Sequence, residues 1–319
     1  MNPKVSIIIA CKDIDILTLE CIDKCSELEY GNFEIIVLHD HGSTLIPGIR
    51  IIPTGEVSPG RKRNIGLENS DSELLAFIDS DAYPKRDWLK NAVRYFSDPG
   101  IGAVGGPGLT PEKDSVMQKA GGYILSSFMV GGLANRYDTG RCRASDDIHS
   151  CNFIARRSVL EETGGWDEKY WPGEDTLICL GIKKTGKRMI EAPDVVVFHH
   201  RRSLFAKHLQ QVSRFGLHRG FFAKRFPETS LRLSYFIPSM FVLFVISGII
   251  FLFIDNSVRV LYIFLLFIYL FAALIVSLMA TAYGKNLLLL PLVFTGTIAT
   301  HIIYGIYFLR GLAARELER

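Results

Sequence analysis

The chain has 319 residues, enough for one large domain with an addition or for two modest domains, and its formal net charge of +3 gives no electrostatic reason to expect nucleic-acid binding. The charge is unevenly spread, since residues 235–319 hold five of the 36 Lys and Arg and three of the 33 Asp and Glu. The first part therefore has the composition of a soluble domain, whereas the last part is apolar and nearly uncharged.

Short apolar runs that end in polar residues open the chain. The run Val5 to Ile9 is followed by a helical pattern that Gly31 closes, and the run Ile35 to Leu38 then leads into Asp40. A strand, a helix and a strand joined by short links are typical of a right-handed parallel crossover. Because strands of this kind are buried on both faces, the runs predict an α/β domain built on a parallel sheet.

A basic helix start comes next. A possible strand over Ile49 to Ile52 precedes Ser58, which can cap a helix that has Pro59 in its first turn. Residues 61–63 of this turn are all basic, and cations beside free backbone N–H groups at a helix N-terminus predict an anion site. A solvated basic turn is the alternative.

The central feature of the sequence is the run Leu74 to Ile78, which ends on Asp79 and Asp81. Its shortness and apolar character predict a buried strand, and open α/β sheets bind ligands beyond the carboxyl ends of their strands. Two carboxylates at such a place favour a hard divalent cation, Mg²⁺ or Mn²⁺, bound together with a diphosphate. For an isolated Asp-x-Asp, an acidic surface turn is the alternative.

Three further elements are expected in this domain. Residues 84–97 predict a helix, residues 102–106 a small-residue strand, and Asp194 to Phe198 a buried strand that ends on His199, a possible metal ligand. The apolar segment 120–134 has only 15 residues, too few to cross a bilayer. Both a core helix and a helix at the membrane surface are compatible with it.

The stretch from His199 to Pro227 has seven Lys and Arg, no acidic residue and many aromatic and aliphatic side chains. This pattern is typical of a segment that lies on an anionic cytoplasmic leaflet, with nucleic-acid binding as the alternative. The scattered cysteines indicate free thiols in a reducing compartment, and the N-terminus has no basic and apolar leader, so we expect the first part to be cytoplasmic.

Three uncharged runs follow, each long enough to cross a bilayer: Tyr235 to Ile254, Val260 to Ala282 and Leu287 to Leu309. The basic stretch before the first run places its start in the cytoplasm, so three crossings put the C-terminus outside. The arginines at positions 310, 315 and 319 instead favour a C-terminus in the cytoplasm. His301, near the middle of the third run, is either a functional group or a neutral histidine bonded within the helices.

In their order and spacing these signals resemble the family-two glycosyltransferases with the GT-A fold, in particular a membrane-anchored branch that includes succinoglycan-type glucosyl transfer. The resemblance covers about residues 4–225. It implies a Rossmann-like GT-A domain over residues 1–200, a basic interfacial segment over 201–230 and a membrane domain of about three helices over 231–319. The implied location is the inner membrane, multi-pass, with a cytoplasmic catalytic domain.

The resemblance assigns residue roles through matched motifs. The opening strand has Ala10 where the family has proline, Asp40-His41-Gly42-Ser43 resembles an Asp-Asp-Gly-Ser turn, and Arg63-Asn64-x-Gly66 matches an Ala-Arg-Asn-x-Gly element. The implied donor-binding residues are Ala10, Asp13, Asp40, Arg63, Asn64 and Asp79, and the implied metal ligands are Asp79, Asp81 and His199.

Further motifs concern the acceptor. Residues 164–168 resemble Gly-Gly-Phe-Asp-Glu, Glu174-Asp175 matches a Glu-Asp pair, and residues 211–215 resemble Gln-x-x-Arg-Trp with Phe in place of Trp. The implied acceptor-binding residues are Asn152, Trp166, Asp167, Glu174, Arg214 and Phe215, and Asp175 is the implied catalytic base.

The implied activity is inverting transfer of a sugar from a nucleotide-diphosphate donor with Mn²⁺ or Mg²⁺. A phosphate acceptor is already anionic and needs no base, so the Glu174-Asp175 pair favours a hydroxyl acceptor, deprotonated by Asp175. The apolar tail favours an acceptor held on lipid, as in surface glycan assembly. The alternatives are a polyprenyl-phosphate monosaccharide synthase, a processive polysaccharide synthase, and a membrane-anchored sugar-binding or scaffold protein with an inactive site.

Overall fold

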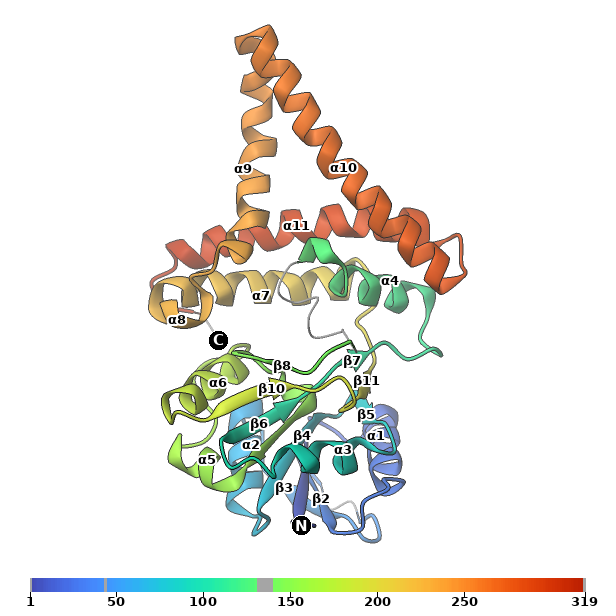
Figure 1. Ribbon diagram of the computed structural model, residues 1–319, viewed down its shortest axis with the longest axis vertical. Helices are drawn as coiled ribbons and strands as arrows, with labels where there is room; N and C mark the ends of the chain where they lie inside the picture. The colour runs from blue at the N-terminus through green and yellow to red at the C-terminus, as the bar shows by residue number, and fades with distance from the viewer. Residues whose placement is uncertain (1, 43–44, 131–139, 318–319) are drawn as a thin grey trace. The chain divides into compact units, whose positions relative to one another are not determined.

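The computed structural model describes residues 2–42, 45–130 and 140–317, which form two compact units (Figure 1). The sheet unit comprises Met1–Leu109 and Arg136–His200, and the helical unit comprises Thr110–Asn135 and Arg201–Arg319. The chain passes from the sheet unit to the helical unit after His200. Residues 110–130 also belong to the helical unit.

An eight-stranded mixed sheet forms the sheet unit, in the order β3-β2-β1-β4-β9-β6-β10-β8. Strands β1 to β4 are parallel to one another, whereas β9 lies antiparallel between β4 and β6. The predicted α/β class is confirmed, and the antiparallel central strand is an addition to the expected parallel sheet. The strands are β1 (Val5–Ala10), β2 (Phe33–His39), β3 (Arg50–Pro53), β4 (Leu74–Asp79), β6 (Ile101–Gly105), β8 (Arg143–Ala144), β9 (Phe153–Arg156) and β10 (Arg188–Glu191).

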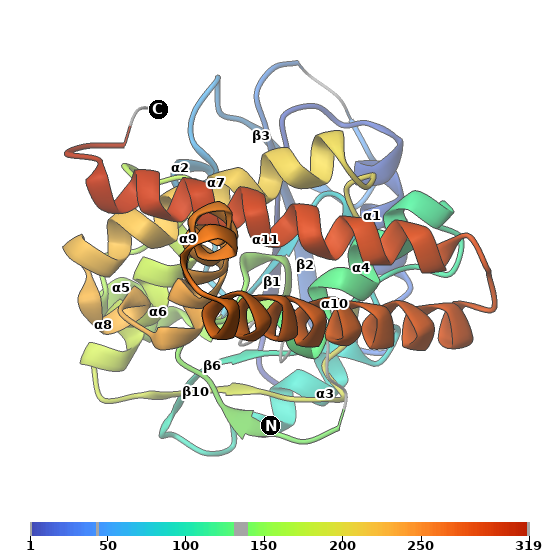
Figure 2. The same ribbon diagram turned by 90° about the horizontal axis from the view of Figure 1, so that it is seen from above.

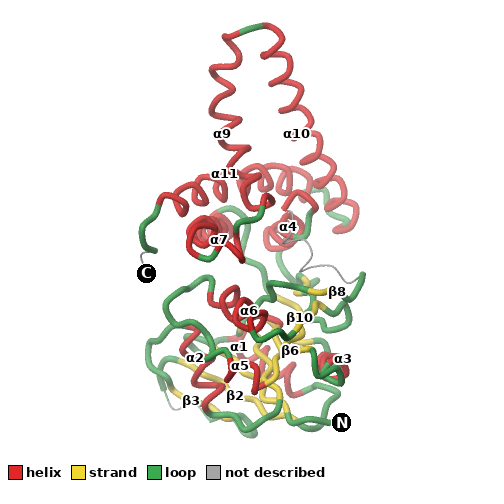
Figure 3. Tube along the Cα trace, turned by 60° about the vertical axis from the view of Figure 1, so that its left-hand side comes forward, coloured by secondary structure: helices red, strands yellow, loops and turns green. Residues whose placement is uncertain are grey.

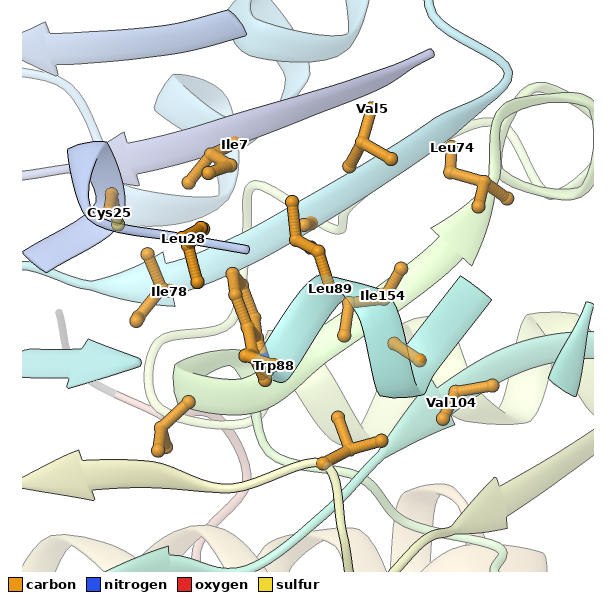
Figure 4. Packing of buried hydrophobic residues seen from close by; sticks show 14 of the residues in the cluster. Val5, Ile7, Cys25, Leu28, Leu74, Ile78, Trp88, Leu89, Val104 and Ile154 are labelled. Carbon is orange, nitrogen blue, oxygen red and sulfur yellow. The ribbon is translucent and has the colours of Figure 1, made fainter. Parts of the chain in front are cut away.

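Helices pack on the sheet because adjacent strand residues point to opposite faces. Ile7 and Ile9 of β1 join one buried cluster, whereas Ile8 joins the other. In Figure 4, Trp88 and Leu89 of α3 reach into the first cluster beside Ile78 and Ile154. Figure 3 shows the helices in red around the yellow strands. The helices of this unit are α1 (Ile16–Ser26), α2 (Pro59–Glu68), α3 (Trp88–Tyr95), α5 (Arg157–Glu162) and α6 (Glu174–Lys184).

A second, three-stranded sheet has the order β5-β11-β7, with β5 at Ala82–Pro84, β7 at Gly108–Leu109 and β11 at Val197–His199. The strand expected over residues 194–198 is thus shorter and lies outside the main sheet. Its antiparallel pairing with β5 sets His199 opposite Ala82, the residue that follows Asp81. This register brings two parts of the chain that are far apart in sequence to one place.

The helical unit consists of α4 (Val116–Leu125), α7 (Ala206–Arg225), α8 (Pro227–Ser230), α9 (Leu233–Ile254), α10 (Asn256–Gly284) and α11 (Leu289–Ala313). Three of these, α9, α10 and α11, are long and apolar enough to cross a membrane by length and composition. Figures 1 and 2 show α11 lying beside α7, while α9 and α10 lead away from them as a pair.

The segment that could be either a core helix or a surface helix begins as α4. Ala120 and Ile124 of α4 are buried in one apolar cluster with Val276 of α10 and Val293 of α11. The helix ends at Leu125, and residues 131–134 of the predicted segment lie outside the described residues. Within the described part, α4 is therefore a core helix of the helical unit.

Candidate functional site

Two carboxylates and an imidazole meet at the end of β4. Asp79 is the last residue of β4 and pairs in register with Ala10 at the end of β1. His199 lies beside Asp81, with its Nε2 3.1 Å from Asp81 Oδ1. One ligand atom from each of Asp79, Asp81 and His199 lies within 4.8 Å of the other two, so the three side chains are close enough to share one cation. The structure thus brings together the three predicted metal ligands.

The His199–Asp81 pair holds a proton tightly. Burial by itself lowers the pKa of His199, but the charge and hydrogen bond of Asp81 outweigh burial and raise the pKa well above its ordinary value. An imidazolium cannot ligate a metal, so a cation that binds His199 must displace this proton.

Arg63 of α2 joins this end of the sheet to the start of α6. Its guanidinium donates to Asp79 Oδ1 at 3.2 Å, to Glu174 Oε1 at 2.9 Å and to Ser150 Oγ at 3.0 Å. The guanidinium carbon also lies 4.8 Å from the ring centroid of Trp166. Burial alone lowers the pKa of Arg63, but the charges of Glu174 and Asp79 raise it above its ordinary value. Arg63, predicted to bind the donor, is therefore held by internal partners.

The predicted catalytic base stands in the first turn of α6. Gly173 precedes the helix with a φ of +126°, a conformation that favours glycine, and Glu174 and Asp175 follow at once. Glu174 is buried against Arg63, whereas Asp175 is half-buried and contributes to raising the Arg63 pKa by its charge. A helix N-terminus stabilises the charged form of a carboxylate. Asp175 is thus close to Arg63, which also contacts Asp79.

Asn64 fastens the Gly-Gly-Trp turn to α2. Its Nδ2 donates to Trp166 O at 2.9 Å and to Glu168 Oε1 at 2.8 Å, and its Oδ1 accepts from the Trp166 N–H at 2.7 Å. Gly165, at a φ of +82°, leaves no room for a Cβ, which would lie 2.6 Å from Asn64 Oδ1. The predicted donor residue Asn64 and the predicted acceptor residue Trp166 are therefore joined in one buried contact.

Asp40, which follows β2, already has a partner within the protein. Its carboxylate is buried and paired with Lys62 Nζ, which also donates to the carbonyl of Cys11. Lys62 stands where the matched family element has alanine, and this departure from the element is the signal that sequence reasoning missed. His41 lies exposed beside Glu56, and Ser43 of the same predicted turn lies outside the described residues.

Other predicted residues have internal or separate positions. The buried Asn152 amide accepts from Trp88 Nε1 and donates to Val195 O, and Asp167 Oδ1 caps the N–H groups of Lys169 and Tyr170. Asp13 is exposed. Arg214 and Phe215 belong to α7 of the helical unit, so their acceptor role stays a prediction.

This geometry agrees with a comparison of the sequence with protein families. A family described as "Glycosyltransferase like family 2" matches residues 3–216, two thirds of the chain. The chain belongs to this family. The matched range spans the carboxylates of β4, Arg63 and the start of α6.

Several glycosyltransferases are similar in sequence to part of the chain. A pre-mycofactocin glycosyltransferase of Mycobacterium tuberculosis is 26% identical over 55% of this chain and 37% of its own length. An O-antigen chain rhamnosyltransferase of Salmonella typhimurium is 30% identical over 46% of this chain and 48% of its own. A glucosyl-dolichyl phosphate glucuronosyltransferase of Haloferax volcanii is 27% identical over 43% and 46%. The chain thus spans less than half the length of these relatives.

A solved structure supports the fold over nearly the whole chain. The mannosyltransferase PcManGT from Pyrobaculum calidifontis, solved with GDP-Man and Mn²⁺, covers 99% of this chain and 89% of its own with a TM-score of 0.63. At 18% identity this similarity concerns the fold alone. The predicted GT-A-like fold with C-terminal apolar helices is confirmed.

Proposed function

We propose that the protein is an inverting, metal-dependent glycosyltransferase that moves a sugar from a nucleotide-diphosphate donor to a hydroxyl of a lipid-linked saccharide during surface glycan assembly. It would belong to the membrane-anchored branch that resembles succinoglycan-type glucosyltransferases, with its catalytic domain in the cytoplasm. The observation that carries this proposal is Arg63, which contacts Asp79 in the metal cluster and Glu174 beside Asp175.

The donor side rests on Asp79, Asp81 and His199, whose ligand atoms have the spacing to hold Mn²⁺ or Mg²⁺. A bound divalent cation supplies Lewis-acid stabilisation of the charge that develops on a departing diphosphate. The solved mannosyltransferase of the same fold contains both GDP-Man and Mn²⁺, which supports a nucleotide-sugar donor.

On the acceptor side Asp175 takes the proton of the attacking hydroxyl. Glu174, the residue before Asp175, is held by an ion pair in which Arg63 Nη1 lies 2.9 Å from Glu174 Oε1. This ion pair fixes the first turn of α6, in which Asp175 also lies. A relative whose name specifies a glucosyl-dolichyl phosphate supports an acceptor that already carries a sugar on lipid.

The test uses the full chain in detergent with Mn²⁺. A panel of nucleotide sugars is first screened by thermal shift, because a bound donor raises stability by mass action. Transfer from the donor that binds is then measured for Asp81→Asn and Asp175→Asn, with the exposed Glu162→Gln as the control. We expect Asp175→Asn to keep donor binding and to lose transfer by at least about 100-fold.

Asp81→Asn should weaken both Mn²⁺-dependent donor binding and transfer, whereas Glu162→Gln should change neither. If Asp175→Asn keeps full transfer to a polyprenyl phosphate, the hydroxyl-acceptor proposal is wrong and the polyprenyl-phosphate synthase replaces it. If no nucleotide sugar binds or turns over, the sugar-binding alternative stands.

A further inference from the structure

Helices α7 and α11 form one parallel pair. His208 Nε2 lies 2.9 Å from Thr300 Oγ1 near one end, and Lys224 Nζ donates to Leu312 O at 3.0 Å near the other. The contact therefore runs from residue 208 to residue 224 of α7, about 24 Å at 1.5 Å per residue. Figures 1 and 2 show the two helices side by side from two directions.

Glycines let the two backbones touch. A Cβ at Gly216 of α7 would lie 2.6 Å from Tyr304 O, and one at Gly220 would overlap Phe308 O. From the other side, a Cβ at Gly311 of α11 would overlap Leu217 O. Because the fit excludes even one added carbon at three positions along the pair, α11 must follow the direction of α7.

α7 cannot cross a bilayer. Its cations occur at the start, the middle and the end, at Lys207, Arg214 and Lys224, and all three side chains are exposed. The stretch from His199 to Pro227 contains no acidic residue. A cation at the bilayer centre is strongly disfavoured, whereas anionic headgroups attract one that lies at the surface.

α9 and α10 have the opposite character. Exposed apolar side chains line them, such as Ile246 and Phe253 of α9 and Phe267 of α10. α9 has 22 residues, about 33 Å, which matches a hydrocarbon core of about 30 Å. The turn between the two helices carries Asp255, whose side chain caps the N-terminus of α10. A polar turn between two apolar helices is typical of a transmembrane hairpin, whose turn lies in water beyond the bilayer.

α11 differs from both of these helices, although it has 25 residues. It has the lowest mean hydropathy of the three and the largest buried share. Its polar residues Thr300 and His301 are buried, in hydrogen bonds to His208 of α7 and Tyr269 of α10.

We propose that only α9 and α10 cross the bilayer, and that α7 and α11 lie together along the cytoplasmic leaflet with anionic lipid headgroups as their partner. Two crossings return the chain to its starting side. Arg310 and Arg315 then lie in the same compartment as the cations of α7, which removes the conflict that three crossings create with the positive-inside rule.

Cysteine labelling in intact cells and after permeabilisation tests this topology. Cys142 is exposed and the other five cysteines are buried, so a Cys142→Ser background should show little labelling of native cysteines. Single cysteines are placed at the exposed Asn256 in the turn, at the exposed Glu316 near the C-terminus and, as a cytoplasmic reference, at the exposed Lys90. Ser257→Cys and Arg315→Cys serve as second positions should a first variant fail to accumulate.

With a membrane-impermeant maleimide we expect Asn256→Cys to label in intact cells, and Glu316→Cys and Lys90→Cys to label only after permeabilisation. Labelling of Glu316→Cys from outside, with Lys90→Cys protected, would establish three crossings and overturn the proposal. Protection of Asn256→Cys in intact cells would overturn the hairpin.

A depth measurement checks α11 separately. Ile306 of α11 and Ile246 of α9 are 44% and 62% exposed, so a fluorophore on a cysteine at either place senses its surroundings. We expect nitroxide on lipid headgroups to quench the probe of Ile306→Cys more strongly, and nitroxide at the ends of the acyl chains to quench that of Ile246→Cys. Equal quenching patterns at the two positions would mean that α11 crosses the bilayer.

Discussion

Two basic helices, α2 and α7, use their cations in opposite ways. In α2, Lys62 and Arg63 are buried and each contacts at least one carboxylate. In α7, Lys207, Arg214 and Lys224 are exposed, and the surrounding stretch of sequence has no acidic residue. The cations of α2 are therefore buried against carboxylates, whereas these three side chains of α7 are exposed on the surface of the helical unit.

The comparison predicts the largest effect at Arg63. Arg63→Met leaves Asp79 and Glu174 without their shared partner, and removal of one member of a buried ion pair costs about 3–5 kcal/mol. We expect a matching drop in the free energy of unfolding and loss of transfer activity. The control is Arg61→Gln, whose pair with Glu68 is exposed, since such pairs contribute at most about 1 kcal/mol. Equal losses for the two variants would contradict the assignment.

A double-mutant cycle tests the second buried pair. Lys62→Met leaves the Asp40 carboxylate buried and unneutralised, and we expect a loss of about 3 kcal/mol in unfolding free energy. Adding Asp40→Asn should recover most of the loss, because replacing both partners is far cheaper than removing one. Additive losses in chemical denaturation would show that the two side chains do not depend on each other.

The inner face of α7 carries a pH-sensitive contact. Burial lowers the pKa of His208 to about 4, below its ordinary value of 6.5. The unfolded chain therefore takes up a proton first, so stability is complete above pH 6.5 and declines toward pH 4. We expect about 2 kcal/mol to be lost between pH 7 and pH 5. His208→Gln should flatten this part of the stability profile in detergent, and an unchanged profile would contradict the buried neutral state.

The smallest expected effect on stability concerns the exposed cations of α7, which we call its outer face. Lys207→Gln with Arg225→Gln removes two exposed cations, each of which gains about 1 kcal/mol from an anionic surface. We expect thermal unfolding in nanodiscs to lose part of the stabilisation that phosphatidylserine gives over phosphatidylcholine, with no change in detergent. If the variant keeps the full phosphatidylserine effect, the outer face of α7 does not contact the headgroups.

Much of the sheet unit could be predicted from local pattern. The start of α2 at Ser58 is as expected, with Ser58 Oγ accepting from the Arg61 N–H at 3.2 Å, and β1 and β4 have nearly the expected bounds. The central strand β9 was missed because its apolar core is only Phe153 to Ala155, too short to show a period. The order of the strands in the sheet could not be predicted, because the spacing of apolar residues along the chain does not show which strands pair.

The candidate site shows the same division. Asp79, Asp81 and His199 could be found because each follows an apolar run. The sequence predicted an anion site at residues 61–63, but in the structure Lys62 pairs with Asp40, and Arg63 pairs with Asp79 and Glu174. These carboxylates are distant in sequence, so the spacing of residues could not reveal the pairs. Likewise, length and composition describe α11 alike whether it crosses a bilayer or lies on one. The proposed surface position of α11 rests instead on its glycine-lined contact with α7 and on its buried polar residues.

The place of β9 sets an order of events during synthesis. β4 and β6 are complete by residue 105, yet the strand that pairs with both is not made until residue 156. The two strand edges that β9 later joins therefore stay open while about fifty more residues are translated, at about 5–20 residues per second. Unpaired edges of this kind template contacts between chains, so the late synthesis of β9 leaves the centre of the sheet exposed to such contacts for a few seconds.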